Sequence, residues 1–124
     1  IQLLLQNRIK HWQKHQFGTY LLRPKDEEFP MGYCGLEYVQ DTSYVDIRYG
    51  LLQSSWGAGY GFEAAKTILN LGFNELKLAT IYGAVVSENT ASSKVLKKIG
   101  MQPCTTVKYY EEKLDYYYIE NKTV

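Results

Sequence analysis

Gly57, Gly59 and Gly61 form the segment of this sequence that is best suited to bind an anion. They follow a β-compatible run and directly precede a helical pattern. The first turn of a helix carries backbone N–H groups without intrahelical partners, and glycine allows a phosphate group to approach them closely. Alternating glycines also suit a tight turn from a strand into a helix. The spacing alone therefore leaves phosphate binding and a purely structural turn equally open.

The positions of these glycines argue against two common phosphate-binding motifs. Counting from Gly57, the sixth position is Phe62, whereas the Rossmann fingerprint requires a glycine there. A Walker A loop requires a lysine followed by serine or threonine, and residues 54–63 contain no lysine. A dinucleotide site and the hydrolysis of a nucleoside triphosphate are therefore both disfavoured.

The elements around the glycines predict one domain with a mixed sheet. A chain of 124 residues fits a single compact domain. Apolar periodicity predicts helices over residues 1–15, 62–72 and 91–99, and strands over residues 17–22, 31–39, 44–52, 75–82, 102–110 and 114–120. Gly72 and Gly100 are expected to end the last two helices. Three consecutive strands predict an antiparallel meander, and the strand–helix–strand unit around the glycines predicts a parallel crossover. The expected fold class is α/β (α+β).

Composition narrows the possible partners. Fourteen basic residues against 13 acidic ones give a net charge of +1, which provides no general reason to expect a nucleic acid partner. No apolar run approaches the roughly 20 residues that cross a bilayer, so no membrane association is expected. Cys34 and Cys104 lack histidines at metal-ligand spacing. We therefore expect no metal site, and a reducing, cytoplasmic location.

Three ordered stretches of the sequence resemble a known family. The stretches are Asp46-Ile47-Arg48-Tyr49 with Leu51, Trp56-Gly57-Ala58-Gly59-Tyr60-Gly61 with Glu63-Ala64, and Ser87-Glu88-Asn89-Thr90-Ala91-Ser92 followed by Val95-Leu96, Lys98 and Ile99-Gly100-Met101. Together they resemble the GNAT superfamily of N-acetyltransferases, especially the branch of ribosomal-protein alanine and spermidine N-acetyltransferases. The resemblance spans about residues 12–118 and implies the GNAT fold. Family members usually carry a further strand and helix first, so residues 1–124 are expected to form one GNAT domain that lacks them.

The resemblance implies acetyl-coenzyme A as cosubstrate, and it assigns residues to it. The glycine loop, Trp56, Gly57, Ala58, Gly59, Tyr60, Gly61 and Phe62, is expected to hold the pyrophosphate. Tyr49, Gly50 and Leu51 would lie along the pantetheine arm. Gly50 replaces a large residue of the branch, which implies either a wider acceptor pocket or loosened packing. Asn89 would touch the pantetheine region, and asparagine also suits a helix N-cap.

The same resemblance suggests which groups could move protons. Ser92 is a candidate to protonate the departing thiolate, although an exposed helical serine is an equal interpretation. Asp46 and Glu37 are the candidate bases for the amine, and Asp46 is preferred because its strand borders the cofactor. The alternative interpretation is that both residues are surface carboxylates on a solvated face of the sheet.

The function that follows is acetyl transfer to a primary amine by direct attack in a ternary complex. The amine could be a protein N-terminus, a polyamine or a small molecule. The alternative is a truncated GNAT domain that binds coenzyme A without turnover. Without the usual first strand, the strand over residues 17–22 becomes a sheet edge, which implies a possible homodimer.

Overall fold

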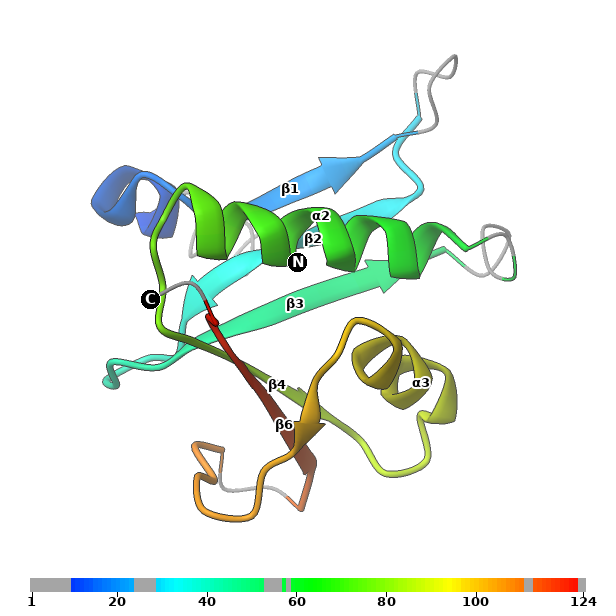
Figure 1. The fold of residues 1–124 in the computed structure, drawn as a ribbon. Coiled ribbons are helices and arrows are strands. Elements are labelled where there is room, and N and C mark those ends of the chain that lie inside the picture. Colours follow the sequence, from blue (N-terminus) through cyan, green and yellow to red (C-terminus); the bar gives the residue numbers. More distant parts are fainter. Residues whose placement is uncertain (1–9, 24–28, 53–56, 58, 111–112, 123–124) are drawn as a thin grey trace.

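The chain folds as a mixed sheet with helices packed against it (Figure 1). The computed structural model describes residues 10–23, 29–52, 57, 59–110 and 113–122. Its strands are β1 (Thr19–Leu22), β2 (Gly32–Tyr38), β3 (Val45–Leu51), β4 (Thr80–Val85), β5 (Gln102–Pro103) and β6 (Asp115–Glu120), and its helices are α2 (Tyr60–Asn74) and α3 (Thr90–Lys98). Residues 10–15 are also helical. The strand order is β1-β2-β3-β4-β6-β5.

The first three strands form the expected antiparallel meander. The turn between β2 and β3 is closed by the Val39 N–H, which donates to the Tyr44 carbonyl over 2.9 Å, and Asp41 adopts a φ of 62° in it. This turn sets the register that pairs Glu37 with Asp46. Because directly paired residues share a face of the sheet, these two carboxylates lie on the same side.

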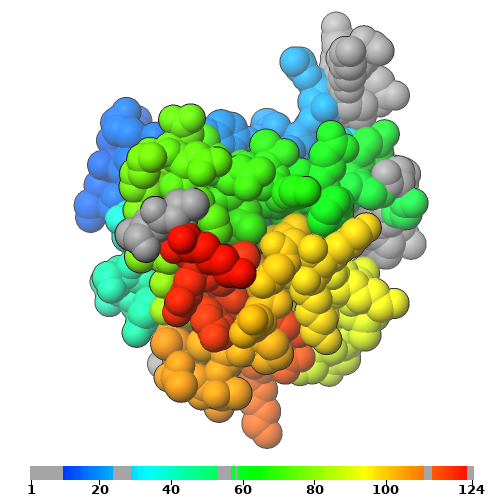
Figure 2. Space-filling model, viewed as in Figure 1, coloured from blue at the N-terminus to red at the C-terminus, as the bar shows by residue number. Residues whose placement is uncertain are grey.

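The opposite face of the meander forms the core against α2. Ala65, Ile68 and Leu69 of α2 are buried together with Leu36 and Ile47 of the sheet. Each of the leucine and isoleucine side chains contributes about 1.5–3 kcal/mol when removed from water. Figure 1 shows α2 in front of β2, between β1 and β3, and Figure 2 shows its surface meeting that of α3, with the end of β6 beside them. Helix α2 thereby returns the chain so that β4 runs parallel to β3, as the crossover prediction required.

Strands β3 and β4 separate almost as soon as they meet. One residue pair, Asp46 with Tyr82, is in register between them, whereas β4 pairs with β6 along its whole length from Thr80 to Val85. In Figure 1 the two strands start close together and diverge toward their C-terminal ends. The sheet therefore has a gap in its middle, bordered by β3 on one side and by β4 and α3 on the other.

Gly72 does not end the second helix, so that prediction was wrong. Helix α2 continues to Asn74, and Gly72 is buried within it. A Cβ atom at Gly72 would lie 2.7 Å from Cδ1 of Leu36 and 2.8 Å from Cδ1 of Ile81. Glycine is therefore present because the helix passes very close to the sheet. Gly100, in contrast, follows α3 with a φ of 103°, as expected of a helix end.

Two strand boundaries also differ from their predictions. Strand β4 begins at Thr80 rather than at Glu75. Strand β5 covers only Gln102 and Pro103, and residues 104–110 leave the sheet. Tyr109 of this segment packs instead against Tyr44, Tyr82 and Tyr116, which belong to the β2–β3 turn, β4 and β6, and the ring of Tyr110 packs against Tyr109. The tyrosines that suggested a strand thus contribute to packing on the sheet face. The turn predicted at residues 111–113 lies mostly outside the described residues.

Strand β1 forms one edge of the described sheet, and self-association through it stays a prediction. Helix residues before β1 are fixed to it by Trp12, whose Nε1–H donates to the Thr19 carbonyl over 2.8 Å. Among the residues described, no helix combines the length and apolar character of a membrane span.

We predict that Gly72→Ala destabilises the protein, although alanine normally favours a helix. The new methyl group would overlap two fully buried side chains, Leu36 and Ile81, and such overpacking costs about 1–3 kcal/mol. Gly61→Ala is the matched control in the same helix, because its Cβ would meet neighbours at an ordinary 3.7 Å. The control should gain up to about 1 kcal/mol. Urea denaturation measures both, and equal stabilities would contradict the close packing at Gly72.

Candidate active site

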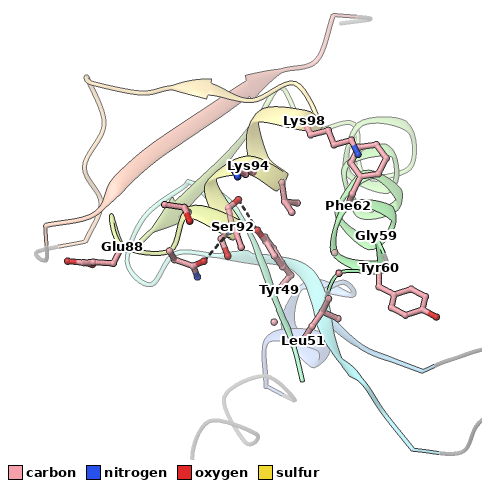
Figure 3. A pocket seen from close by; sticks show the side chains of 16 residues that line it. Tyr49, Leu51, Gly59, Tyr60, Phe62, Glu88, Ser92, Lys94 and Lys98 are labelled. Carbon is pink, nitrogen blue, oxygen red and sulfur yellow. Dashed lines mark hydrogen bonds between the residues drawn. The ribbon is translucent and has the colours of Figure 1, made fainter. Parts of the chain in front are cut away.

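The larger cavity of the site, about 750 Å³, lies between the start of α2, helix α3 and the end of β3. Its wall contains Tyr49, Gly50 and Leu51 of β3, Gly57 and Gly59 to Phe62 before and within α2, and residues of α3 with its N-cap. In Figure 3, Tyr49 and Leu51 lie between α3 and the start of α2, while Tyr60 and Glu88 point outward at opposite ends. We call this space the α2–α3 cavity.

The glycine segment opens the α2–α3 cavity to the N-terminus of α2. Gly57 and Gly59 have φ values of 85° and 82°, the left-handed region that favours glycine. A Cβ atom added at either position would meet nothing within 4 Å, so open space lies beside the backbone. Gly59 is the N-cap of α2 and provides no side-chain hydrogen bond to it. The first-turn amides of α2 therefore face a space that an anion could enter.

Two lysines of α3 add positive charge to this cavity. Lys94 and Lys98 both contribute to its wall. The Lys98 ammonium lies 4.4 Å from the centre of the Phe62 ring, a cation–π contact that joins the end of α3 to the start of α2. The cavity thus combines a helix N-terminus with two ammonium groups, and this combination favours a ligand that carries phosphate.

Asn89 and Tyr49 fix α3 beside the gap in the sheet. Asn89 is the N-cap of α3, and its Oδ1 accepts the Ser92 N–H over 3.1 Å, which confirms the capping interpretation. The Tyr49 hydroxyl donates to the Ser92 carbonyl over 3.0 Å, shown as a dashed line in Figure 3. This second bond connects β3 to α3 across the space where β3 and β4 have separated.

A second cavity, of about 360 Å³, lies in the gap and reaches the polar face of the sheet. Tyr33, Asp46, Arg48 and Tyr110 contribute to its wall, together with residues 84–86 at the end of β4. Tyr49, Asn89 and Ser92 border both cavities. We call this space the gap cavity. The two cavities therefore share three lining residues.

The polar face holds two buried carboxylates joined by one guanidinium. Arg48 donates from Nε to Asp46 Oδ1 and from Nη1 to Glu37 Oε1, each over 3.0 Å. Asp46 and Glu37 are only 2% and 5% exposed, so neither is a surface carboxylate on a solvated face. Thr19 donates a further hydrogen bond to Glu37. We call Glu37, Asp46 and Arg48 the charge cluster.

Burial and ion pairing shift the pKa values of Asp46 and Arg48. Burial raises the pKa of Asp46 above its usual value, and the nearby Arg48 guanidinium offsets only part of that rise. Burial alone would lower the pKa of Arg48, but the Asp46 carboxylate raises it overall. The raised pKa makes Asp46 a stronger base than an exposed aspartate.

Tyr110 closes the charge cluster from outside the sheet. Its hydroxyl donates to Asp46 Oδ2 over 2.9 Å. Burial, followed by the charge of Asp46, raises the pKa of Tyr110 to about 12, so its phenol stays protonated near neutral pH. The Tyr116 hydroxyl bonds to both the N–H and the carbonyl of Tyr110 and so holds the residue in place.

Tyr33 occupies the space above Gly50. A Cβ atom at Gly50 would lie 2.8 Å from Cε1 and 3.0 Å from the hydroxyl oxygen of Tyr33. The absence of a large side chain at position 50 therefore leaves neither a wider pocket nor loose packing at this point. The ring of Tyr33, supplied by the neighbouring strand, fills the place instead.

The structure brings most of the expected site residues together. Tyr49, Gly50, Leu51, Asn89, Ser92 and the described glycine-loop residues border the α2–α3 cavity. Trp56 and Ala58 lie outside the described residues. Asp46 borders the gap cavity, and Glu37 is joined to it through Arg48. In the described part of the chain, no group of three or more metal-ligating side chains is gathered.

Sequence reasoning assigned no role to Arg48, Tyr33 or Tyr110. The hairpin register could have revealed the first two, because it pairs Arg48 with Gly35 and Gly50 with Tyr33 on the face that carries Asp46. Tyr110 could not have been found in this way, since it reaches Asp46 from a segment that we expected to be a strand.

Comparison with known proteins places the chain in a family. A family model described as an acetyltransferase (GNAT) domain matches residues 2–102. The uncharacterized N-acetyltransferase p20 of Bacillus licheniformis is 32% identical over 98 residues, which are 78% of this chain and 55% of that protein. The chain spans about half the length of the curated relatives that it matches first.

Solved structures share the fold. An acetyltransferase from Agrobacterium tumefaciens superposes with a TM-score of 0.84 at 19% identity and covers 91% of this chain and 66% of its own. The protein yncA from Salmonella typhimurium, solved with its cofactor acetyl-CoA, superposes with a TM-score of 0.75 at 12% identity and covers 94% of this chain and 73% of its own. These likenesses confirm the expected GNAT fold class.

We predict that Arg48→Met destabilises the protein in a pH-dependent way. Without the guanidinium, two buried carboxylates lose their partner, which costs about 3 kcal/mol near pH 8. The pKa of Asp46, already raised by burial, would rise further in the folded state. A folded-state pKa above the unfolded value means that stability is present at low pH and lost as pH rises. Urea denaturation between pH 4 and pH 8 should therefore show the deficit growing with pH.

Arg48→Lys is the matched control, because it keeps a positive charge between Glu37 and Asp46. It should show a smaller and flatter deficit than Arg48→Met. A deficit in Arg48→Met that is the same at both ends of the pH range would contradict the ion pairing described above.

Proposed function

The chain belongs to the GNAT acetyltransferase family, and on that premise we propose that it transfers an acetyl group from acetyl-CoA to a primary amine. Transfer would occur by direct attack in a ternary complex. The observation that carries this proposal is the junction of the two cavities at Tyr49, Asn89 and Ser92. A donor in one cavity and an acceptor in the other would have their reacting ends side by side, which is the main requirement of direct transfer.

The α2–α3 cavity has the features needed for acetyl-CoA. Backbone amides of residues 57–62 and the ammonium groups of Lys94 and Lys98 would hold phosphate groups. Beyond Asp46, β3 has no registered partner in β4, so the backbone of Tyr49, Gly50 and Leu51 borders the gap where a pantetheine arm would lie. Trp56 and Ala58 belong to the same proposed loop. When bound, acetyl-CoA supplies an acetyl group activated as a thioester.

Asp46 is the residue that we propose as the base. It borders the gap cavity, is almost fully buried, and its pKa is raised, so it is suited to accept the proton of an arriving ammonium group. Glu37 meets Arg48 rather than the cavity wall. Its proposed role is to balance the charge of Arg48 together with Asp46. When Asp46 accepts a proton, Glu37 would still neutralise the guanidinium.

Ser92 is the residue that we propose as the donor to the departing sulfur. It lies in the first turn of α3, and its side chain belongs to the wall that the two cavities share. Its backbone is held on both sides, by Asn89 through the N–H and by Tyr49 through the carbonyl. These two bonds fix the backbone that carries the hydroxyl, which supports a role in proton transfer at the shared wall.

The alternative function is a domain that binds coenzyme A without turnover. It draws support from the charge cluster, in which both candidate bases already bind Arg48. Calorimetry with acetyl-CoA, followed by a thiol-release assay with a panel of amines and N-terminal peptides, separates the two functions. Binding followed by thiol release supports transfer, whereas binding with no thiol release for any acceptor supports the alternative. Failure to bind acetyl-CoA would contradict both.

We predict that Gly59→Asp weakens acetyl-CoA binding at least tenfold more than Gly59→Asn does. The two side chains have the same shape and both tolerate the left-handed backbone at Gly59, so the difference isolates a negative charge beside the proposed phosphate site. Ser92→Ala should leave the Kd nearly unchanged and lower kcat. Calorimetry gives the Kd values and thiol release gives kcat. Equal effects of the aspartate and asparagine variants would contradict phosphate binding at this loop.

We predict that Asp46→Asn lowers kcat by about 10²-fold or more near neutral pH, because general base catalysis contributes on this scale. The remaining activity should rise steeply with pH as the amine loses its proton to solvent. Glu37→Gln is the control at the paired position across the hairpin, and it should lose less activity. Thiol-release rates measured from pH 6 to pH 10 test this prediction. If Glu37→Gln showed the larger loss, the base would be misassigned.

A further inference from the structure

We propose that the gap cavity selects a compact amine that arrives as a cation and carries no carboxylate, and that Tyr33 sets the size limit. This inference rests on the proposed function, because it narrows the acceptor of the same reaction. It depends on two features, the charge of the cluster that borders the cavity and the ring that lies on Gly50.

The charge cluster favours a cation. With Glu37 and Asp46 ionised and Arg48 protonated, the cluster carries one net negative charge, and all three side chains are mostly buried. Apart from Asp46 and Arg48, the described wall of the cavity contains no lysine, arginine, histidine, aspartate or glutamate side chain. Charges that are poorly screened by water act strongly on a nearby ligand. An ammonium group in the cavity is therefore attracted by the net charge.

The positive charge of Arg48 is already balanced by two carboxylates, which disfavours a further carboxylate on the acceptor. Its Nε and Nη1 donate to Asp46 and Glu37 over 3.0 Å, and its Nη2 faces the Tyr110 hydroxyl at 3.4 Å. A carboxylate entering the cavity would meet a guanidinium already neutralised by two carboxylates, and it would be repelled by the excess negative charge. An amino acid acceptor is thus disfavoured relative to a simple amine of the same length.

Tyr33 limits how large the acceptor can be. Its ring lies against the Gly50 backbone, where even a methyl group would approach it to 2.8 Å, so the ring has no room to move toward β3. The cavity holds about 360 Å³, less than half the volume of the α2–α3 cavity. Tyr33 and Tyr110 also present aromatic rings to it, which attract cations. Shortening Tyr33, which belongs to the wall, should therefore enlarge the cavity.

The charge inference is tested with butylamine and 4-aminobutyrate, which share a four-carbon chain and differ by the carboxylate. Ligand-observed NMR with the full chain gives a Kd for each without the need for turnover. Butylamine should bind at least tenfold more tightly than 4-aminobutyrate. Equal affinities, tighter binding of 4-aminobutyrate, or no binding of either compound would overturn the proposal.

The size inference is tested with Tyr33→Ala and 1-naphthylmethylamine as the bulky probe. The ratio of the butylamine affinity to the naphthylmethylamine affinity should fall at least tenfold in Tyr33→Ala and stay unchanged in Tyr33→Phe, which keeps the ring. If Tyr33→Ala does not fold, Tyr33→Leu should change the ratio in the same direction by a smaller amount. An unchanged ratio in the folded variant would overturn the role of Tyr33.

Thiol release from acetyl-CoA with the same amines distinguishes a failure of the proposed selectivity from a failure of acetyl transfer. Selective amine binding without thiol release would contradict acetyl transfer and leave the selectivity of the cavity standing. Turnover of 4-aminobutyrate with the same kcat/KM as butylamine would support acetyl transfer and overturn the selectivity.

Discussion

The separation of β3 and β4 is the constraint on which both cavities depend. Parallel strands normally pair along their length, and their exposed backbone groups would otherwise need other partners. Here one pair, Asp46 with Tyr82, is in register before the two strands diverge. The fold tolerates the break because β3 pairs with β2 and β4 pairs with β6, and because one core cluster, which includes Ile47 of β3 and Ile81 of β4, joins the two halves. The gap is therefore maintained by what lies on each side of it.

The gap also explains why polar and apolar groups are arranged as they are. The face of the meander toward α2 is apolar and supplies the core, so the charged residues of the alternating pattern are directed to the other face. There Arg48 allows two carboxylates to be buried within hydrogen-bonding distance of it. Such a group of charges contributes little net stability. Its presence beside the gap is more easily explained by chemistry at that point than by folding.

Much of this arrangement could be predicted from the sequence, and the exceptions have physical reasons. The meander, the crossover and the Asn89 cap follow local rules of alternation, connection and capping, and each was found as expected. Gly72 was misread because its role depends on contacts with Leu36 and Ile81, which lie in other elements. Tyr110 was missed because it reaches Asp46 from a segment 64 residues away, whereas the register of the hairpin could have indicated Tyr33. Local sequence patterns therefore predicted the secondary-structure elements and their connections, and long-range packing determined which side chains lie between them.

The hydrogen bond from Tyr49 to the Ser92 carbonyl makes the wall between the two cavities a shared mechanical element. Asn89 and Ser92 belong to the start of α3 and Tyr49 belongs to β3, so a ligand that displaced α3 on one side would also change the shape of the space on the other. If both cavities bind ligands, thermodynamic linkage requires reciprocity: whatever factor the first ligand applies to the affinity of the second, the second applies to the first.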